Sequence, residues 1–158
     1  MKTRSLLIAM VIGVVVVFFA AGIYAAAKVE DVFKIQNEGC EYTKGIAEFS
    51  HKKHAEEYAA KAPELNKRGC GECHHDKDNK PLSNEAAAKG VQKCIECHKK
   101  CGEAPKGKDA PKLSKEQKRE YLANAYHDNC KTCHKAYNNA NNTKAAPTTC
   151  TKCHPKTE

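Results

Sequence analysis

Four cysteine pairs constrain this chain more than any other feature of its sequence. In each pair two residues separate the cysteines, and a histidine follows the second cysteine at once. The four copies are Cys70-Gly-Glu-Cys73-His74, Cys94-Ile-Glu-Cys97-His98, Cys130-Lys-Thr-Cys133-His134 and Cys150-Thr-Lys-Cys153-His154. This spacing is the attachment signature of c-type haem, in which both thiols bond to one edge of the porphyrin and the histidine binds the iron. The sequence therefore predicts four covalent haem c groups.

Two other chemistries also use paired cysteines. Structural zinc sites combine two Cys-x-x-Cys pairs and do not need the trailing histidines. A thioredoxin-like dithiol uses one Cys-x-x-Cys within a βαβ unit, and the sequence pattern shows no such unit. Four histidines at the same position after four pairs favour haem over both.

Residues that build hydrophobic cores are scarce after the first segment. Leu, Ile, Val and Phe account for only twelve of the 131 residues from 28 to 158, about 9%, whereas values below about 20% are typical of disordered chains. Such a composition cannot bury enough apolar surface to offset the conformational entropy lost on folding. We therefore expect a mostly α and irregular protein, with short helices and loops wrapped around haems that serve as its core.

Four histidines remain outside the attachment motifs. They are His51, His54, His75 and His127. The two methionines lie at positions 1 and 10, so methionine ligation is excluded if the first segment is removed. Four extra histidines for four irons predict bis-histidine ligation throughout. Such ligation leaves no open position on the iron, which favours electron transfer at low potential over catalysis at the metal.

The first two of these histidines lie in one predicted helix. This helix covers residues 51–62, with Ser50 as its N-cap and Pro63 after its end. Because positions three apart share a helix face, His51 and His54 can serve two neighbouring irons.

The other two histidines lie beside attachment motifs. His75 directly follows His74, and adjacent side chains on a helix point about 100° apart. The two cannot bind one iron, so we expect His75 to reach a second haem. His127 lies three residues before Cys130, on the helix expected to carry that attachment site.

Four segments in combination carry a resemblance to a known family. They are Phe49-Ser-His51-x-x-His54, Cys70-x-x-Cys73-His74-His75, Tyr126-His127-x-x-Cys130-x-x-Cys133-His134 and Cys150-x-x-Cys153-His154. Over residues 29–155 the chain resembles the class III cytochrome c family, the tetrahaem periplasmic cytochromes of sulfate- and metal-respiring anaerobic bacteria and their trihaem relatives.

The resemblance implies how the histidines share the irons. The implied pairs are His74 with His51, His98 with His75, His134 with His54, and His154 with His127. Trihaem members lack the site that Cys94, Cys97 and His98 supply here. In tetrahaem members the fourth distal histidine can sit a little earlier in its helix than His127 does.

Two cysteines, Cys40 and Cys101, lie outside the attachment motifs and are too few for a fifth haem. In an oxidising compartment a disulfide between them is the simplest interpretation. It would close a long loop across the first two haem sites. Two free thiols or an intermolecular linkage are the alternatives.

Residues 1–27 are predicted to be a signal peptide. Lys2 and Arg4 precede an uncharged run from Leu6 to Ala27, which ends in small residues typical of a signal-peptidase site before Lys28. The run has 22 residues, long enough to span a bilayer, so an uncleaved inner-membrane anchor is the alternative. Either way, residues 28–158, the predicted tetrahaem domain, would lie in the periplasm.

Between the motifs, the pattern predicts short elements. Apolar residues at 28–35 and 46–49 are expected to pair as a small β-hairpin. One helix is expected over 86–97, and another from the capping box Ser114-Lys-Glu-Gln117 to His127 or beyond. Polar turns or loops are expected at 76–84, 102–111 and 138–147.

The charge of the chain bears on its partners. The net charge is +8, and removal of Lys2 and Arg4 leaves +6. The propionates of four haems would offset much of this charge, so we expect no nucleic-acid binding. Four lysines near the fourth motif are a hypothetical docking patch for an acidic redox partner, with a solvated face as the alternative. They are Lys131, Lys135, Lys152 and Lys156.

The family resemblance implies redox proteins as partners in anaerobic respiration. The donor would be a periplasmic hydrogenase or formate dehydrogenase, and the acceptor a membrane redox complex. Two further functions stay open. A terminal reductase would need an iron with an open axial site, and a structural assembly would stack subunits haem to haem or hold the cytochrome at a membrane.

Overall fold

The computed structural model describes residues 30–156. They form short helices and loops beside one two-stranded antiparallel sheet, which confirms the predicted fold class. The predicted signal peptide, residues 1–27, lies outside the described residues. Among residues 30–156, every helix is too short or too polar to cross a membrane.

The elements follow one another in small pieces. The strands are β1 (Val32–Lys34) and β2 (Glu48–Ser50), followed by a π-helix η1 (Lys53–Tyr58), α2 (Ala59–Lys61), and the 3₁₀ helices η2 (Pro63–Leu65) and η3 (Gly69–Glu72). The remaining helices are α3 (Asn84–Ala88), α4 (Cys94–Cys97), α5 (Lys115–Arg119), α6 (Leu122–Ala140) and α7 (Cys150–Cys153).

The predicted hairpin is present. Strand β1 pairs with β2 so that Phe33 lies opposite Phe49, and their rings meet edge to face with centres 5.5 Å apart. Directly opposite aromatic residues stabilise an antiparallel pair. The hairpin fixes Phe49 just before the helical stretch that carries His51 and His54, and the Phe49 ring lies 4.4 Å from that of His54.

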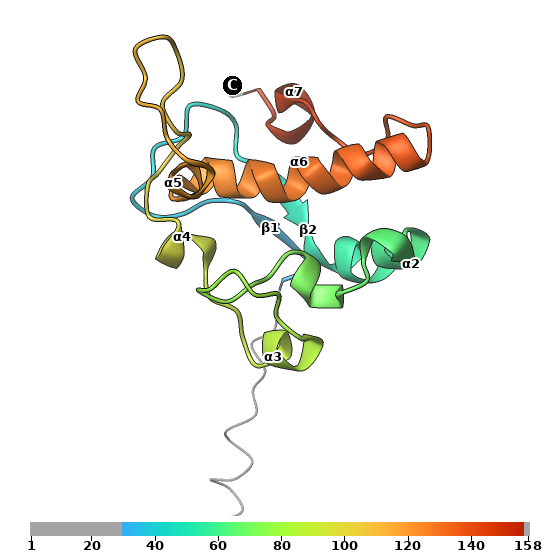
Figure 1. Cartoon of the computed structure of the whole chain (residues 1–158). Helices are drawn as coiled ribbons and strands as arrows, with labels where there is room; N and C mark the ends of the chain where they lie inside the picture. The colour runs from blue at the N-terminus through green and yellow to red at the C-terminus, as the bar shows by residue number, and fades with distance from the viewer. Residues whose placement is uncertain (1–29, 157–158) are drawn as a thin grey trace, which may run out of the picture.

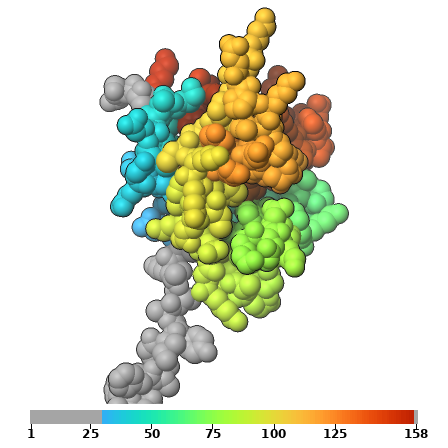
Figure 2. Space-filling model, turned by 60° about the vertical axis from the view of Figure 1, so that its left-hand side comes forward, coloured from blue at the N-terminus to red at the C-terminus, as the bar shows by residue number. Residues whose placement is uncertain are grey.

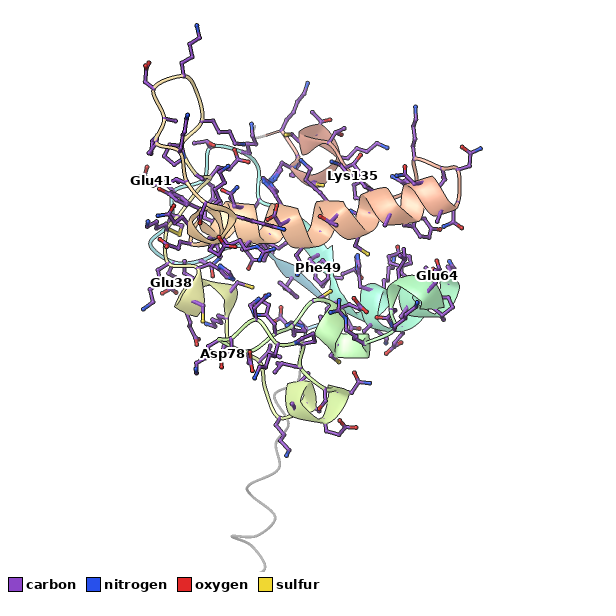
Figure 3. The ribbon with its side chains drawn as sticks, viewed as in Figure 1. Glu38, Glu41, Phe49, Glu64, Asp78 and Lys135 are labelled. Carbon is purple, nitrogen blue, oxygen red and sulfur yellow. A yellow bond between two sulfur atoms is a disulfide. The ribbon has the colours of Figure 1, made fainter. Side chains whose placement is uncertain are left out.

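Helix α6 runs through the middle of the molecule. Figure 1 shows it with α5 at one end, α7 on one side and the hairpin and α2 on the other. Figure 3 shows Phe49 lying on the hairpin side of α6, while Glu38, Glu41 and Glu64 lie toward the edges of the view. The long helix therefore provides the support around which the shorter elements are arranged.

The described part of the chain has almost no hydrophobic core of its own. Within residues 30–156 the buried apolar residues are Ala62, Ala104 and Leu122, and no large side chain is fully buried. Two of these three are alanines, which bury little apolar area. Residues 30–156 alone thus lack the core that a domain of this size normally forms, as the composition predicts.

The prediction of one continuous helix over residues 86–97 is wrong. Helix α3 ends at Ala88, and Gly90 adopts a φ of +126°, which glycine tolerates and other residues rarely do. Residues 91–93 lie outside any helix before α4 begins at Cys94. Glycine at the end of α3 thus separates the two helices.

The helix predicted from Ser114 through His127 is also interrupted. The capping box is confirmed: the Ser114 hydroxyl accepts the Gln117 N–H at 3.2 Å, and the Gln117 side chain accepts the Ser114 N–H at 2.8 Å. Helix α5 nevertheless ends at Arg119, because Tyr121 takes an extended conformation and forms a parallel bridge with Lys100. This pairing separates α5 from α6.

Ser50 was predicted to be the N-cap of the helix that carries His51 and His54, and this prediction is wrong. It is the last residue of β2, and its backbone carbonyl accepts a 2.8 Å hydrogen bond from Nδ1 of His54. The helical stretch runs over residues 51–61 and stops before Pro63, as predicted, although much of it is π-helical.

The loops predicted at 76–84 and 102–111 are present over most of their length. Helix α6, however, extends to Ala140 and shortens the predicted 138–147 linker. Figure 2 shows the 102–111 loop, in gold, projecting from the surface.

Candidate functional site

The eight histidines meet in four pairs. The ring centres are 6.2 Å apart for His51 and His74, 6.1 Å for His54 and His134, 6.0 Å for His75 and His98, and 6.3 Å for His127 and His154. Each pair joins one motif histidine with one histidine outside the motifs. The fold therefore brings together the pairs that the family resemblance implies.

The spacing within the pairs fits two imidazoles on opposite sides of one metal ion. Two metal–nitrogen bonds of about 2 Å, plus about 1 Å from each nitrogen to its ring centre, separate the ring centres by about 6 Å. Within residues 30–156, no three His, Cys, Asp or Glu side chains gather as a metal site of their own. Pairs are what haem iron requires, since the porphyrin supplies its other four ligands. The residues present thus fit haem.

Backbone carbonyls orient five of the eight rings. Nδ1 of His54, His75, His134 and His154 lies 2.8, 2.7, 2.7 and 2.8 Å from the carbonyls of Ser50, Asp76, Pro147 and Gly45, and Nδ1 of His98 bonds to that of Arg119. A carbonyl can only accept, so the proton is on Nδ1 and the Nε2 lone pair is available to a metal. His127 differs, because its Nδ1 lies 3.0 Å from a carboxylate oxygen of Glu103.

Burial favours the neutral form that a metal ligand must have. Desolvation lowers the pKa of His54, His74 and His127. For His54 it outweighs the opposing hydrogen bond to Ser50. These imidazoles are thus more readily neutral than exposed ones, which suits metal binding.

The first attachment site lies on η3 and is fixed by Asn84. The Asn84 side chain accepts the Cys70 N–H at 2.9 Å, and the His74 N–H bonds to the Cys70 carbonyl at 2.9 Å. Gly69 has a φ of +55°, and a Cβ there would lie 2.3 Å from the Asn84 oxygen. Glycine therefore allows Asn84 to approach the backbone of this site.

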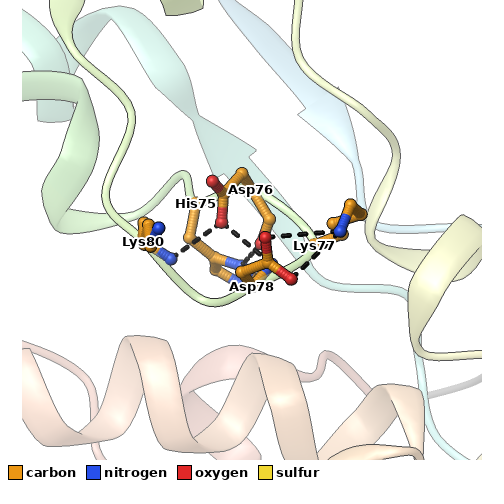
Figure 4. Close-up of polar contacts among 5 residues, drawn as sticks. All are labelled: His75, Asp76, Lys77, Asp78 and Lys80. Carbon is orange, nitrogen blue, oxygen red and sulfur yellow. Dashed lines mark hydrogen bonds and ion pairs between the residues drawn. The ribbon is translucent and has the colours of Figure 1, made fainter.

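His75 points away from His74 for a reason different from the predicted one. The helix has ended at Glu72, and His75 forms an isolated antiparallel bridge with Pro81. Extended backbone directs successive side chains to opposite faces. The turn that follows is held by the Asp76 carboxylate, which accepts the N–H groups of Asp78 and Lys80 at 2.9 Å each (Figure 4).

The second attachment site occupies α4, a single turn that is supported from outside. Three residues after His98, Cys101 forms a disulfide with Cys40, and their Cα atoms are 5.5 Å apart. Between His98 and Cys101, the Lys100 carbonyl accepts the Leu122 N–H at 2.7 Å, and the Lys100 N–H donates to the Glu120 carbonyl at 3.0 Å. Both ends of this support come from distant parts of the sequence.

The third attachment site lies entirely within α6. His127, Cys130 and His134 are spaced by three and four residues, so they share one face of the helix. Burial raises the pKa of the Cys130 thiol to about 11. The nearby thiols of Cys73, Cys153 and Cys94 add to this shift. One cysteine of each other motif is therefore near enough to Cys130 to affect its pKa.

Asn138 positions the partner of His134. Its side chain accepts the Ala146 N–H at 3.0 Å and donates to the Ala146 carbonyl at 2.9 Å. These two bonds fix the loop in which Pro147 presents its carbonyl to His134. Sequence reasoning did not identify this role, because an asparagine in a polar linker carries no signal for it.

The fourth attachment site lies on α7 and depends on Gly45. The Gly45 carbonyl accepts the bond from His154, and a Cβ at Gly45 would lie only 2.1 Å from the Pro155 carbonyl oxygen. In the sequence Gly45 lies directly before the second apolar stretch of the predicted hairpin, residues 46–49. Its contact with a residue 109 positions away could not be read from the local pattern.

The four lysines of the hypothetical docking patch lie on two elements and the C-terminal segment. Lys131 and Lys135 are one turn apart on α6, and Figure 3 shows Lys135 on the side of α6 that faces α7. Lys152 is exposed on α7 and donates to the Lys144 carbonyl at 3.1 Å. Lys156 is exposed just beyond α7.

Comparison with known proteins gives one match. The model of the Class III cytochrome C family matches residues 26–154, which include all four motifs and all eight histidines. Searches of curated proteins and of solved structures gave no match.

Proposed function

Because the chain belongs to the class III cytochrome c family, whose members are multihaem electron-transfer proteins with covalent haem c, we propose that it is a low-potential periplasmic electron carrier with four bis-histidine haems. The observation that carries this proposal is the set of four histidine pairs with ring centres 6.0–6.3 Å apart. Each pair is adjacent to one Cys-x-x-Cys motif.

At each site the cysteines and the histidines have different roles. Two cysteines would tether one haem, and two histidines would hold its iron from both sides. When bound, the haem supplies one-electron chemistry at iron. Because two histidines would hold each iron, no position for substrate would remain at the metal, which favours electron transfer over catalysis there.

Three features of the chain support a low potential and exchange among the sites. Residues 30–156 contain no methionine, and methionine ligation is what raises the potential of cytochromes c. Carbonyl acceptors at Nδ1 make the histidines more basic, which favours ferric iron. His51 and His54 lie three residues apart and pair with His74 and His134, so the haems of these two pairs would be neighbours and electrons could pass between them.

We propose export by residues 1–27 and action between redox proteins of the periplasm. The donor would be a hydrogenase or formate dehydrogenase and the acceptor a membrane redox complex, with Lys131, Lys135, Lys152 and Lys156 as the docking patch. Opposite charge at such a surface raises the rate of association and makes it salt-dependent.

Ferric holoprotein made with a working haem-attachment pathway tests this function by low-temperature electron paramagnetic resonance. We expect low-spin signals for every haem and no stable high-spin fraction. A stable high-spin haem would instead indicate an open axial position and a terminal reductase. A colourless protein that binds zinc would contradict the proposal altogether.

The docking patch has a separate test. In the Lys152→Gln/Lys156→Gln variant we expect a weaker salt dependence of the rate of electron exchange with an acidic redox protein. The control is Lys77→Gln/Lys80→Gln, which removes the same charge from the turn after His75 (Figure 4). Equal salt dependence in wild type and the first variant would reject this patch.

A further inference from the structure

His127 has a different partner from the other histidines that bond through Nδ1. Five rings donate to neutral backbone carbonyls, whereas Nδ1 of His127 lies 3.0 Å from Oε1 of Glu103. A carboxylate carries a full negative charge, so it acts on the imidazole more strongly than a neutral carbonyl does. One site in four therefore has an axial ligand beside a formal negative charge.

Glu103 is held in place by contacts on both sides. Before it, Gly102 accepts the Ala123 N–H at 3.0 Å, and Cys101 is tied by the disulfide to Cys40. After it, Ala104 is buried and donates its N–H to the Asn124 side chain at 2.7 Å.

These anchors fasten the segment to the first turn of α6. Asn124 lies three residues before His127, on the same face of the helix. The projecting 102–111 loop thus begins from a fixed point, and Glu103 is part of that point.

The carboxylate of Glu103 is also oriented from its far side. Its Oε2 pairs with Nζ of Lys106 at 2.6 Å, while Oε1 faces His127. The two oxygens therefore have separate partners. The ion pair favours the charged carboxylate and fixes its plane, so that one oxygen remains directed at the ring.

We propose that Glu103 is a positioning residue that holds His127 for its iron and lowers the reduction potential of the haem shared by His127 and His154. A carboxylate that accepts the Nδ1 proton increases the negative character of the imidazole and stabilises ferric over ferrous iron. Reduction takes one electron from a reduced redox protein, and the proton stays on Nδ1. This inference rests on the proposed bis-histidine ligation.

Two variants separate the hydrogen bond from the charge. Glu103→Gln keeps an acceptor oxygen but removes the charge. Glu103→Asp keeps the charge, but its shorter side chain withdraws the carboxylate from Nδ1. Exchange NMR of the partly reduced holoprotein can follow the methyl signals of each haem separately, and the haem of this site is identified by its contacts with His127.

We expect both variants to raise the potential of this haem relative to the other three. The expected shift is a threefold to tenfold change in its one-electron equilibrium constant, and tenfold corresponds to about 59 mV.

Either of two results would overturn the inference. In one, Glu103→Gln leaves the order and spacing of the four potentials unchanged in a protein that retains four low-spin haems. In the other, Glu103→Asp behaves as wild type, so that charge alone sets the potential. Loss of a haem or a high-spin site in the wild-type protein would instead be a failure of the proposed ligation. Mass and spin state, measured first, distinguish this outcome.

Discussion

The second and third attachment motifs have the same spacing but different supports. Cys130, Cys133 and His134 lie inside α6, which has 19 residues and also carries His127. The second motif is the four-residue turn α4. Contacts from distant segments hold that turn in place, namely the disulfide, the Lys100–Tyr121 bridge and the Arg119 carbonyl.

The difference shows that the motif itself does not determine its support. A single helical turn is unstable alone, because nucleation fixes several residues for one hydrogen bond. The geometry of α4 must therefore come from tertiary contacts, whereas α6 contributes its own. We expect the two sites to respond differently to the same changes.

The largest difference is expected when each site loses its cysteines. The Cys94→Ser/Cys97→Ser variant should remain a folded protein with three haems, because the second site lies near one end of α6. Cys130→Ser/Cys133→Ser should accumulate poorly and lose protease resistance, because it removes the haem between α6 and the helix that carries His54. Intact mass and limited proteolysis measure both. Equal tolerance of the two losses would remove the contrast.

Removal of the disulfide should affect the second site more than the third. For Cys40→Ser/Cys101→Ser we expect the free energy of unfolding to fall by about 2–4 kcal/mol. Hydrogen–deuterium exchange should accelerate over residues 94–101 and change little over 122–140. Uniform acceleration would mean that the disulfide stabilises the whole fold and not α4 in particular.

Asn138 links the third site to the loop after α6, which sharpens the comparison. Asn138→Ala breaks both bonds to Ala146 and should lower the free energy of unfolding by about 1–3 kcal/mol. It should also loosen the Pro147 carbonyl from His134, which histidine NMR can detect. The adjacent Asn139→Ala is the control, since Asn139 is exposed. An equal effect of both variants would show that α6 alone holds His134.

The smallest expected effect concerns the capping box before α6. Ser114→Ala should cost about 1 kcal/mol in thermal or denaturant unfolding. Ser114→Asp retains a capping oxygen and should lose much less. Because Tyr121 interrupts the helix after α5, the loss should leave hydrogen exchange in α6 unchanged. Faster exchange in α6 would show that the two helices fold as one.

Local sequence patterns predicted the structural features that depend only on residues close together in the chain. The Ser114 capping box and the Phe33–Phe49 hairpin are decided within short stretches, and both are confirmed. The mostly α and irregular fold class follows from the haem motifs and the scarcity of apolar residues. Pro63 ends its helical stretch because proline lacks an N–H group.

The remaining features depend on contacts between distant segments. The break at Tyr121 requires Lys100, and the orientation of His154 requires Gly45. Glu103 looks like one more charged residue of a loop until the fold places it against His127. A single sequence carries no signal for such pairs, because their residues are joined only after the chain has folded.

The intact mass of the denatured, natively matured protein tests the central claim, that four covalent haems supply the core that the polypeptide lacks. We expect the mass of residues 28–158 plus four haems. Residues 1–158 plus four haems would leave the claim standing and show a retained anchor. Fewer than four haems would mean that a motif is unused and a histidine pair has no iron, and no haem at all would contradict the account.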